Sequence, residues 1–433
     1  MRWIEWNAAA PSDRERTLLR PTRARSPQVT ARVAGILADV RERGAQAVDE
    51  WASRLDGAAM QRLEITDDAV ADATARISSQ DLAALKLAAG AIRRFHVVDR
   101  PAEGPESETL PGVFSRRVWR PLDRVGLYVP GGSAPLFSTL LMLAIPAEVA
   151  GVTERVVVTP PARDGVVDPM IVLAAREAEL DAIWLVGGAQ AIGAMAYGAG
   201  LPRVDKVFGP GNAWVAEAKR QVSAESGGPA VDLPAGPSEL LVIADVRANP
   251  ELVAADLLGQ AEHDADAQVL LVTPSAALAR EVAEAVARRL EGLPRAEIAR
   301  RSLEAAAIIL CRDLTEAADI ANIYGPEHLS LQVRDPEQLV ARIRHAGTVF
   351  AGDAAAETFG DYLAGPSHVL PTDGAARAFS GVTTAAFMKS FAVQRVSRDG
   401  LPALAEAAGR LARLEGLEAH ARAADLRRGR LRP

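Results

Sequence analysis

Two series of apolar segments alternate with helical patterns, and this alternation constrains the fold more than any other feature of the chain. The first series comprises VGLYV, RVVVTP, AIWLVG and VDKVFG, and the second comprises ELLVIAD, QVLLVT, AAIILC, HLSLQV and TVFAG. Unbroken runs of valine, isoleucine and leucine between helices are typical of parallel strands covered on both faces. The sequence therefore predicts two doubly wound α/β domains with parallel sheets, joined near PAGPSEL at residues 234–240.

Composition narrows the class of protein. With 433 residues the chain is too long for one hydrophobic core, and its net charge of −7 argues against a nucleic-acid partner. The longest apolar run, LLMLAIPA, is too short to span a bilayer, and the N-terminus lacks the apolar segment of a signal peptide. We therefore expect a cytoplasmic protein. Its single cysteine, Cys311, lies in a predicted buried strand and cannot form an intrachain disulfide.

Three predicted strands run into glycine-rich turns, YVPGGSAP, VGGAQAIG and VFGPGNAW. Glycines at the carboxyl ends of parallel strands let the backbone approach a phosphate at a helix N-terminus. None of the three turns matches the dinucleotide fingerprint G-x-G-x-x-G, and one such turn alone is explained by ordinary turn chemistry. Three in one α/β series favour a nucleotide crevice, in which Tyr128, Gln190 and Asn212 are candidate contacts.

A second constellation suggests a metal site. Gln260 and His263, in QAEH, are three residues apart and share one helical face, and three further histidines lie in GPEH, GDYLAGPSH and EGLEAH. Each histidine alone is also explained as a helix-terminal or solvated residue. Together, imidazole, carboxylate and amide oxygen suit Zn²⁺ or a similar divalent ion in an open, substrate-binding site. Our hypothesis is that Gln260, His263, Asp361 and His420 converge.

The GPEH segment has a separate interest because it places a carboxylate next to an imidazole. Glu327 and His328 follow Gly325-Pro326, which predicts a turn entering the strand HLSLQV. Near a metal and a nucleotide, these two side chains are candidates for water activation and proton abstraction. A polar turn with no chemical role explains the same four residues equally well.

Taken together and in this order, the motifs resemble those of the histidinol dehydrogenase family, from about residue 30 to the end of the chain. The resemblance runs through GLYVPGGSAPLFSTLLMLAIPA, VGGAQAIGAMAYG, FGPGNAWVAEAKRQVS, DLPAGPSELLVIAD, DLLGQAEHDADAQVLLVT, YGPEHLSLQV, GDYLAGPSHVLPT and EGLEAHARA. It implies NAD⁺-dependent oxidation of L-histidinol, through bound L-histidinaldehyde, to L-histidine, the last steps of histidine biosynthesis.

The resemblance also implies roles for individual residues. The family's zinc ligands, one ion per subunit, fall on Gln260, His263, Asp361 and His420. The position of His328 corresponds to the family's general base, which accepts a proton from the alcohol and later from the hydrated aldehyde. The position of Glu327 corresponds to the residue that activates water. The implied NAD⁺ contacts are Tyr128, Gln190 and Asn212. The implied substrate contacts are Ser238, Gln260, His263, His328, Asp361, Glu415 and His420, with Glu357 and His368 as further candidates.

On this basis we expect two Rossmann-like domains and two small terminal segments. Residues 26–127 and 238–378 would form the α/β domain with the metal and catalytic residues, and 128–237 the NAD-binding domain. Residues 1–25 would be an N-terminal arm. Residues 379–433 would be a helical C-terminal segment that completes the site of the partner in a homodimer, as the resemblance implies.

Three other functions remain compatible with parts of the pattern. A related dehydrogenase acting on another small alcohol would share the scaffold, although the presence of Glu327, His328, Glu415 and His420 favours histidinol. A metal-dependent hydrolase would leave the glycine-rich turns without a role. A metabolite-binding protein would have no need of the adjacent glutamate and histidine.

Overall fold

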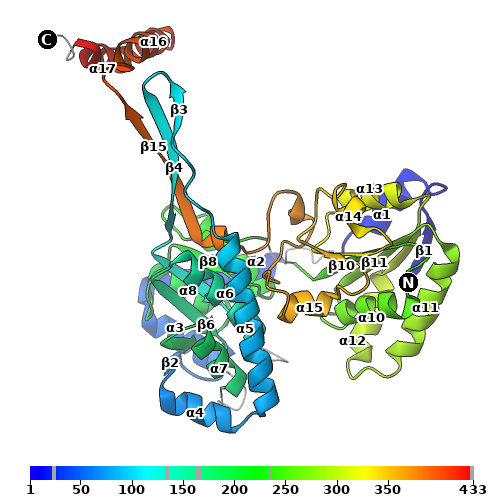
Figure 1. The fold of residues 1–433 in the computed structure, drawn as a ribbon. Coiled ribbons are helices and arrows are strands. Elements are labelled where there is room, and N and C mark those ends of the chain that lie inside the picture. Colours follow the sequence, from blue (N-terminus) through cyan, green and yellow to red (C-terminus); the bar gives the residue numbers. More distant parts are fainter. Residues whose placement is uncertain (22–25, 132–135, 162–166, 235, 430–433) are drawn as a thin grey trace. The chain divides into compact units, whose positions relative to one another are not determined.

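The computed structural model describes residues 1–21, 26–131, 136–161, 167–234 and 236–429. The chain divides into two compact units. The first comprises residues 1–99 and 122–387, and it contains two six-stranded sheets (Figure 1). The second comprises residues 100–121 and 388–433, with one three-stranded sheet and two helices.

The first sheet has the strand order β2-β7-β6-β5-β8-β9. Its strands are β2 (Gln61–Glu64), β5 (Arg124–Tyr128), β6 (Glu154–Thr159), β7 (Ala182–Leu185), β8 (Lys206–Phe208) and β9 (Ala230–Val231). All pairings are parallel except that of β2 with β7. The order of the five parallel strands reverses between β5 and β8, which is the switch point of a doubly wound sheet.

Two groups of helices accompany this sheet. In one group, α8 (Gly188–Tyr197) contacts α2 (Pro27–Arg43), α3 (Ala45–Leu55) and α9 (Ala213–Ser223). The other group is α4 (Asp67–Ala75), α5 (Ser79–Asp99), α6 (Phe137–Ala150) and α7 (Pro169–Glu177). Helix α6 contains the run LLMLAIPA and is buried along most of its length. The longest apolar run of the sequence is therefore a core helix.

The second sheet is parallel throughout, in the order β1-β12-β11-β10-β13-β14. Its strands are β1 (Arg2–Glu5), β10 (Glu239–Ala244), β11 (Gln268–Thr273), β12 (Ala307–Leu310), β13 (His328–Gln332) and β14 (Thr348–Ala351). Its helices are α1 (Pro11–Leu18), α10 (Pro250–Ala261), α11 (Ala276–Leu290), α12 (Ala296–Ala305), α13 (Leu314–Tyr324), α14 (Pro336–Val340) and α15 (Glu357–Tyr362). Alternate residues of β10 and β11 enter separate apolar clusters, so this sheet has a hydrophobic core on each face.

The second unit is an antiparallel sheet followed by a helix pair. Its strands are β3 (Ser107–Leu110), β4 (Val113–Pro121) and β15 (Met388–Val396), and its helices are α16 (Leu401–Leu414) and α17 (Glu418–Gly429). Two short 3₁₀ turns, η1 (Ala375–Arg377) and η2 (Thr384–Phe387), precede β15 in the chain and belong to the first unit. Over the described residues, no helix is both long and apolar enough to cross a membrane.

The predicted fold class is confirmed, but three of the expected domain limits differ from the structure. Within the first unit, which holds both sheets, residues 26–99 do not accompany the second sheet. Instead β2 pairs with β7, and α2 and α3 contact α8 of the first sheet. An amphipathic helix shows in its sequence that it covers a sheet but not which one, because the partner is distant in the chain.

The two terminal segments differ from expectation for the same reason. The predicted N-terminal arm contributes an edge strand, since β1 pairs in parallel with β12 and Trp6 is buried. The predicted helical C-terminal segment begins with β15, which pairs with β4 over nine residues. Both strands are exposed on much of their surface and lack the unbroken apolar pattern that marked the central strands.

His96 is fully buried in α5, and burial lowers its pKa from 6.5 to about 4. The folded protein therefore binds this proton more weakly than the unfolded chain does, so stability is lost as the pH falls from 6.5 towards 4. The loss attributable to one such histidine is about 3 kcal/mol. In urea unfolding at a series of pH values, His96→Gln should flatten the dependence of the unfolding free energy on pH in this window. His345→Gln, at a residue outside the core, is the matched histidine replacement, and equal slopes for both variants would contradict the assignment.

Candidate active site and metal centre

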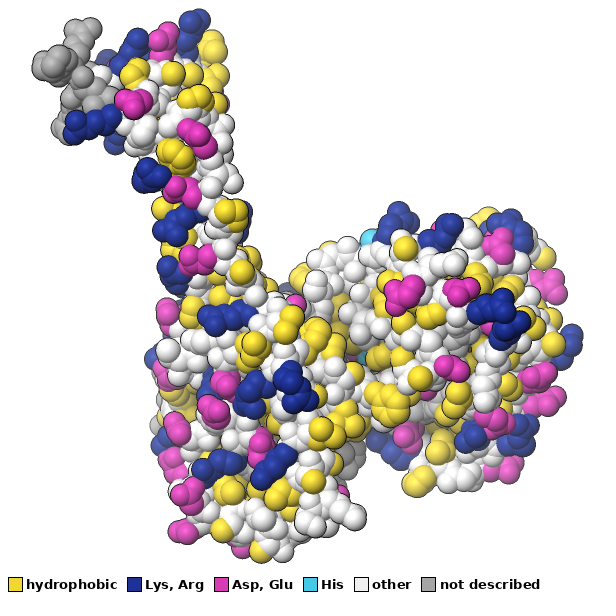
Figure 2. Space-filling view, viewed as in Figure 1, with side chains coloured by type: hydrophobic (Ala, Val, Ile, Leu, Met, Phe, Trp, Pro, Cys, Tyr) yellow, Lys and Arg dark blue, Asp and Glu magenta, His cyan; other side chains and the backbone are white. Residues whose placement is uncertain are grey.

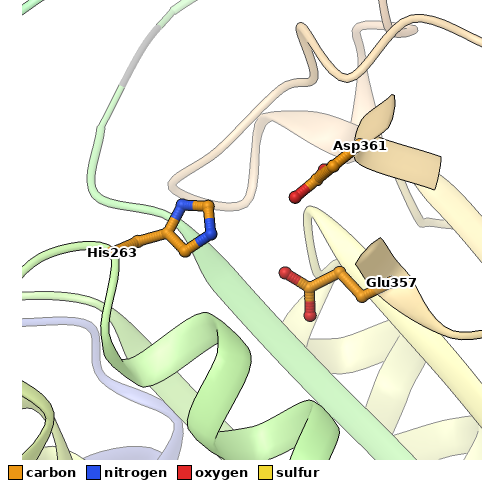
Figure 3. A group of neighbouring side chains, drawn as sticks. All are labelled: His263, Glu357 and Asp361. Atoms are coloured by element: carbon orange, nitrogen blue, oxygen red, sulfur yellow. The ribbon is translucent and has the colours of Figure 1, made fainter. Parts of the chain in front are cut away.

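Three side chains from two elements form a cluster of metal-type donors. His263 follows α10, whereas Glu357 and Asp361 lie one turn apart on α15. One donor atom of each lies within 4.8 Å of the others, and their polar groups point towards a common space (Figure 3). We call these three residues the donor cluster. Two of its members, His263 and Asp361, were predicted as ligands, whereas Glu357 was expected only near the substrate.

The charge of the donor cluster favours a bound cation. Burial raises the pKa of Glu357 well above its usual range, and the carboxylates of Asp361, Glu327 and Asp256 raise it further. Like charges crowded in this way are relieved by a divalent ion, and an imidazole nitrogen with carboxylate oxygens is a suitable donor set for zinc. The residues present therefore fit the predicted metal.

Gln260 supplies a further observation at the end of α10. Its side chain is fully buried, and neither its amide oxygen nor its amide nitrogen has a partner among the described residues. A buried amide with no partner costs about 1–3 kcal/mol, so a buried orphan amide calls for a ligand. His263 lies three residues further along the chain, and its backbone N–H donates to the carbonyl of Gln260.

His328 is the first residue of β13 and is held in one tautomer. Its Nδ1 lies 3.1 Å from the carbonyl oxygen of Glu239, and because a carbonyl only accepts, Nδ1 carries the proton. Nε2 is then the unprotonated nitrogen, and it lies 3.9 Å from Oδ1 of Asp361. Burial lowers the pKa of His328 to about 4. At neutral pH this imidazole is uncharged and able to accept a proton beside the donor cluster.

Glu327 is also fixed by the backbone of Glu239. Its Oε2 accepts a hydrogen bond of 2.8 Å from the Glu239 N–H and lies 3.5 Å from Nδ1 of His328. Burial raises the pKa of Glu327 well above its usual range, and the nearby carboxylates of Glu239 and Asp361 act in the same direction. A raised pKa makes the ionised carboxylate a stronger base.

The side chain of Glu239, together with Arg20, was not identified from the sequence. Arg20 Nε and Nη2 donate to the two carboxylate oxygens of Glu239, at 2.5 and 2.8 Å. No signal in the sequence joins these residues, because one lies shortly after α1 and the other begins β10. The fold alone makes them neighbours.

His368 joins the donor cluster to the first sheet's helices. Its Nδ1 lies 2.9 Å from the carbonyl oxygen of Asp361 and therefore carries the proton, whereas Nε2 lies 3.1 Å from the Thr139 hydroxyl of α6. Both ring nitrogens thus have protein partners. In this arrangement His368 positions the backbone at Asp361.

The turn between β7 and α8 is organised by Asp56, which the sequence did not reveal, together with the predicted Tyr128 and Gln190. The backbone N–H of Gly187 donates to Asp56 at 2.9 Å, and that of Gly188 donates to the Tyr128 hydroxyl at 3.2 Å. Gln190 Nε2 also donates to Asp56, at 3.0 Å, while its Oε1 has no partner within the described chain. Both glycine N–H groups are already used, so a phosphate cradle of free amides is not present here. Asp56, a lone carboxylate after α3, gave no sequence signal.

The turn after β8 is held by a buried ion pair. Lys219 pairs with Asp232, and each also bonds Gly209, whose N–H donates to Asp232 at 2.7 Å and whose carbonyl accepts from Lys219 at 2.9 Å. Gly209 has a φ of +115°, and a Cβ there would lie 2.1 Å from the carbonyl oxygen of Tyr128. Only glycine fits this turn. The exposed Asn212 then caps α9.

The remaining predicted residues lie elsewhere or outside the described chain. Ser238 is half-buried immediately before β10, and its carbonyl accepts from the N–H of Gln268. Glu415 and His420 are exposed in the second unit, at the end of α16 and in α17. The turn YVPGGSAP extends into residues 132–135, which lie outside the described residues. The structure brings together Gln260, His263, Glu327, His328 and Asp361 around one end of the second sheet.

The fold and this site are those of an enzyme: two doubly wound sheets, with an uncharged imidazole beside a cluster of metal-type donors. A family model described as "Histidinol dehydrogenase" matches residues 19–428. The histidinol dehydrogenase of Xylella fastidiosa (strain 9a5c) is 47% identical over 430 residues, covering 99% of each chain. That of Escherichia coli (strain K12) is 46% identical over 425 residues, covering 98% of this chain and 97% of the relative.

A crystal structure of histidinol dehydrogenase from Elizabethkingia anophelis matches the fold with a TM-score of 0.95, at 37% identity over 100% of this chain and 98% of that one. The chain belongs to the histidinol dehydrogenase family and is an oxidoreductase. The resemblance predicted from the motifs is confirmed.

The donor cluster predicts that Asp361→Asn lowers the affinity for zinc by at least on the order of 10–100-fold, the loss found even for partners outside the inner ligands. Zinc bound per chain after dialysis against graded free zinc is the measurement. Asp353→Asn makes the same change at an exposed carboxylate shortly before α15 and should bind zinc as the unmodified chain does. Failure of the unmodified chain to retain any divalent ion, or equal binding by the two variants, would exclude this site.

Proposed function

We propose that the chain catalyses the NAD⁺-dependent four-electron oxidation of L-histidinol to L-histidine through L-histidinaldehyde. The observation that carries the proposal is the neutral His328, whose unprotonated Nε2 lies 3.9 Å from Asp361 of the donor cluster. The family to which the chain belongs supports the same reaction. We refer to Glu327 and His328 as the proposed catalytic pair.

In the first oxidation, His328 Nε2 accepts the proton of the substrate hydroxyl. Loss of this proton prepares the carbon that bears the hydroxyl to give up a hydride. The oxidised nicotinamide of NAD⁺ would supply the hydride acceptor, and the product would be the aldehyde. The low pKa of His328, about 4, keeps the ring uncharged at neutral pH. The hydrogen bond from Nδ1 to the Glu239 carbonyl leaves Nε2 as the unprotonated nitrogen, on the side of the ring away from Glu239.

In the second oxidation, Glu327 accepts a proton from the water that attacks the aldehyde carbonyl, and the protonated His328 returns its proton to the carbonyl oxygen. The aldehyde hydrate is then complete, and His328 Nε2 is again able to accept a proton. The hydrate then loses a hydroxyl proton to His328. A second NAD⁺ would supply the acceptor for the hydride from the hydrate carbon, and the product would be the carboxylic acid. Burial strengthens Glu327 as a base by raising its pKa. Because Glu327 and His328 share Glu239 as a backbone partner, both bases serve one bound substrate.

Zinc would be held by Gln260, His263 and Asp361, with His420 as the fourth ligand and Glu357 as an adjacent donor. The ion would supply a fixed, redox-inactive site that holds a chelating substrate in place. The proposed substrate contacts, beyond these ligands, are Ser238, His328 and Glu415.

NAD⁺ would be contacted by Tyr128, Gln190 and Asn212 at the carboxyl end of the first sheet. Burial raises the pKa of Tyr128 to about 12, so the hydroxyl keeps its proton to donate while it accepts from Gly188. Gln190 Oε1 is buried without a partner in the described chain and is free to accept. Asn212 is exposed at the start of α9.

A homodimer in which Glu415 and His420 complete the partner's site accounts for the second unit. This unit is small and exposes apolar side chains (Figure 2). Among them, Phe391 is 49%, Leu411 63% and Leu414 84% exposed. Such apolar exposure is typical of a surface that another chain covers.

The proposed reaction predicts that limiting L-histidinol releases two equivalents of NADH from zinc-loaded protein. Absorbance at 340 nm measures the yield, and removal of the metal by a chelator should abolish it. One equivalent would mean that the reaction stops at the aldehyde and would remove the role of Glu327. No NADH from folded, zinc-loaded protein would contradict the proposed substrate.

The base assigned to the reaction predicts that His328→Ala lowers kcat by about 10²–10⁴-fold, the usual contribution of a general base. Zinc content and the circular dichroism spectrum should be unchanged, since His328 is not a proposed ligand. His345→Gln serves as a control for histidine replacement and should keep full turnover. Retention of turnover by His328→Ala would place the base elsewhere.

A further inference from the structure

A largely buried ion pair includes Glu239, the residue whose backbone is hydrogen-bonded to both members of the proposed catalytic pair. Arg20 and Glu239 expose 18% and 3% of their side chains, and the guanidinium donates to both carboxylate oxygens. Arg20 Nη2 also donates to the carbonyls of Tyr324 and Gly325, at 2.9 and 3.3 Å, and the guanidinium lies 4.0 Å from the centre of the Tyr324 ring. Arg20 therefore ties the N-terminal segment to the residues that lead into Glu327.

Glu239 is hydrogen-bonded through its backbone to both members of the proposed catalytic pair. Its backbone N–H donates to Glu327 Oε2, and its carbonyl accepts from His328 Nδ1. Its side chain also accepts from the N–H of Asp373, at 2.7 Å. One residue thus sets the rotamer of the carboxylate and the tautomer of the imidazole, and its own side chain is fixed from the other side by Arg20.

We propose that Arg20 is a positioning residue for the oxidation, acting through Glu239 on Glu327 and His328. The inference rests on the proposed function, because it takes these two side chains as the bases. Arg20 acts only through Glu239, so we assign it no part in proton transfer.

The physical reason is that removing one partner of a buried ion pair leaves the other as an uncompensated buried charge, which is strongly destabilising. Without Arg20, the Glu239 carboxylate is left buried without its counterion, close to Glu327 and to the donor cluster. The Glu239 carboxylate can regain solvation only by moving. Because the Glu239 backbone is hydrogen-bonded to Glu327 and His328, these side chains move with it. A displacement of about 1 Å at reacting groups costs on the order of 10²-fold in rate, although substrate affinity need not change.

The chain offers a closely matched control. Arg93 of α5 donates through Nε and Nη2 to both oxygens of Glu148, at 3.3 and 2.7 Å, and through Nη2 to the carbonyl of Glu177, at 2.9 Å. Arg93 therefore makes the same kinds of bonds, to one carboxylate and one carbonyl, but in the helices of the first sheet. Loss of this pair should lower stability without changing kcat.

The experiment measures kcat, KM for L-histidinol and zinc content for zinc-loaded Arg20→Ala, Arg20→Lys, Glu239→Gln, Arg93→Ala and His328→Ala. For Arg20→Ala we expect kcat to fall on the order of 10²-fold, with KM and zinc content near those of the unmodified chain. Arg20→Lys should recover part of kcat, because an ammonium restores the charge but not the two parallel bonds. Glu239→Gln should also lower kcat, since its amide cannot accept both bonds from Arg20.

Two results would overturn the inference. Unchanged kcat in folded Arg20→Ala would do so, and so would an equal loss of kcat in Arg93→Ala, which would mark a general effect of destabilisation. If Arg20→Ala does not fold, Arg20→Lys and Glu239→Gln decide by the same criterion, kcat relative to Arg93→Ala. Full turnover in His328→Ala would instead refute the proposed base, whereas an inactive His328→Ala with a fully active Arg20→Ala would refute only the positioning role.

Discussion

The parallel pairing of β10 with β13 is the contact on which the rest of the site depends. Its register places Leu240 opposite His328, so the preceding residue, Glu239, reaches both Glu327 and His328 through its backbone. Backbone groups cannot rotate away as side chains do, and β10 is buried over its whole length. The two proposed bases are therefore fixed by the sheet itself.

The crowding of carboxylates at this end of the sheet is the main electrostatic cost of the arrangement. Glu239, Glu327, Glu357 and Asp361 lie close together, and the pKa values of Glu327 and Glu357 rise in consequence of burial and mutual repulsion. Arg20 balances Glu239, and the proposed zinc would balance the donor cluster. The N-terminal segment thereby contributes to a site formed by residues more than 200 positions further along the chain.

The two sheets share a strand order, but the proposed site residues lie at the carboxyl ends of the strands in the first sheet and at the amino ends in the second. The proposed NAD⁺ contacts lie at the carboxyl ends of β5, β7 and β8, around the switch point expected of doubly wound sheets. The proposed bases, Glu327 and His328, precede or begin β13, at the amino end of the second sheet. Each end has its own largely buried ion pair, Lys219 with Asp232 in the first and Arg20 with Glu239 in the second. In both cases the ion pair forms hydrogen bonds to the backbone near the proposed NAD⁺ contacts or the proposed bases.

The sequence by itself determined the class of fold, because central parallel strands are marked by their own apolar runs. It also determined the family, because several motifs occur in one order. It placed Gln260 and His263 near each other, since their spacing is local, although His263 lies beyond the end of α10 and not on a face of that helix. Only the tertiary structure decided that Glu357 joins His263 and Asp361, that Asp56 occupies the turn before α8, and that Arg20 stands behind Glu239. The edge strands β1, β2 and β15 were likewise missed. Each depends on a partner far away in the chain, and neither composition nor local periodicity records which distant segment will pack there.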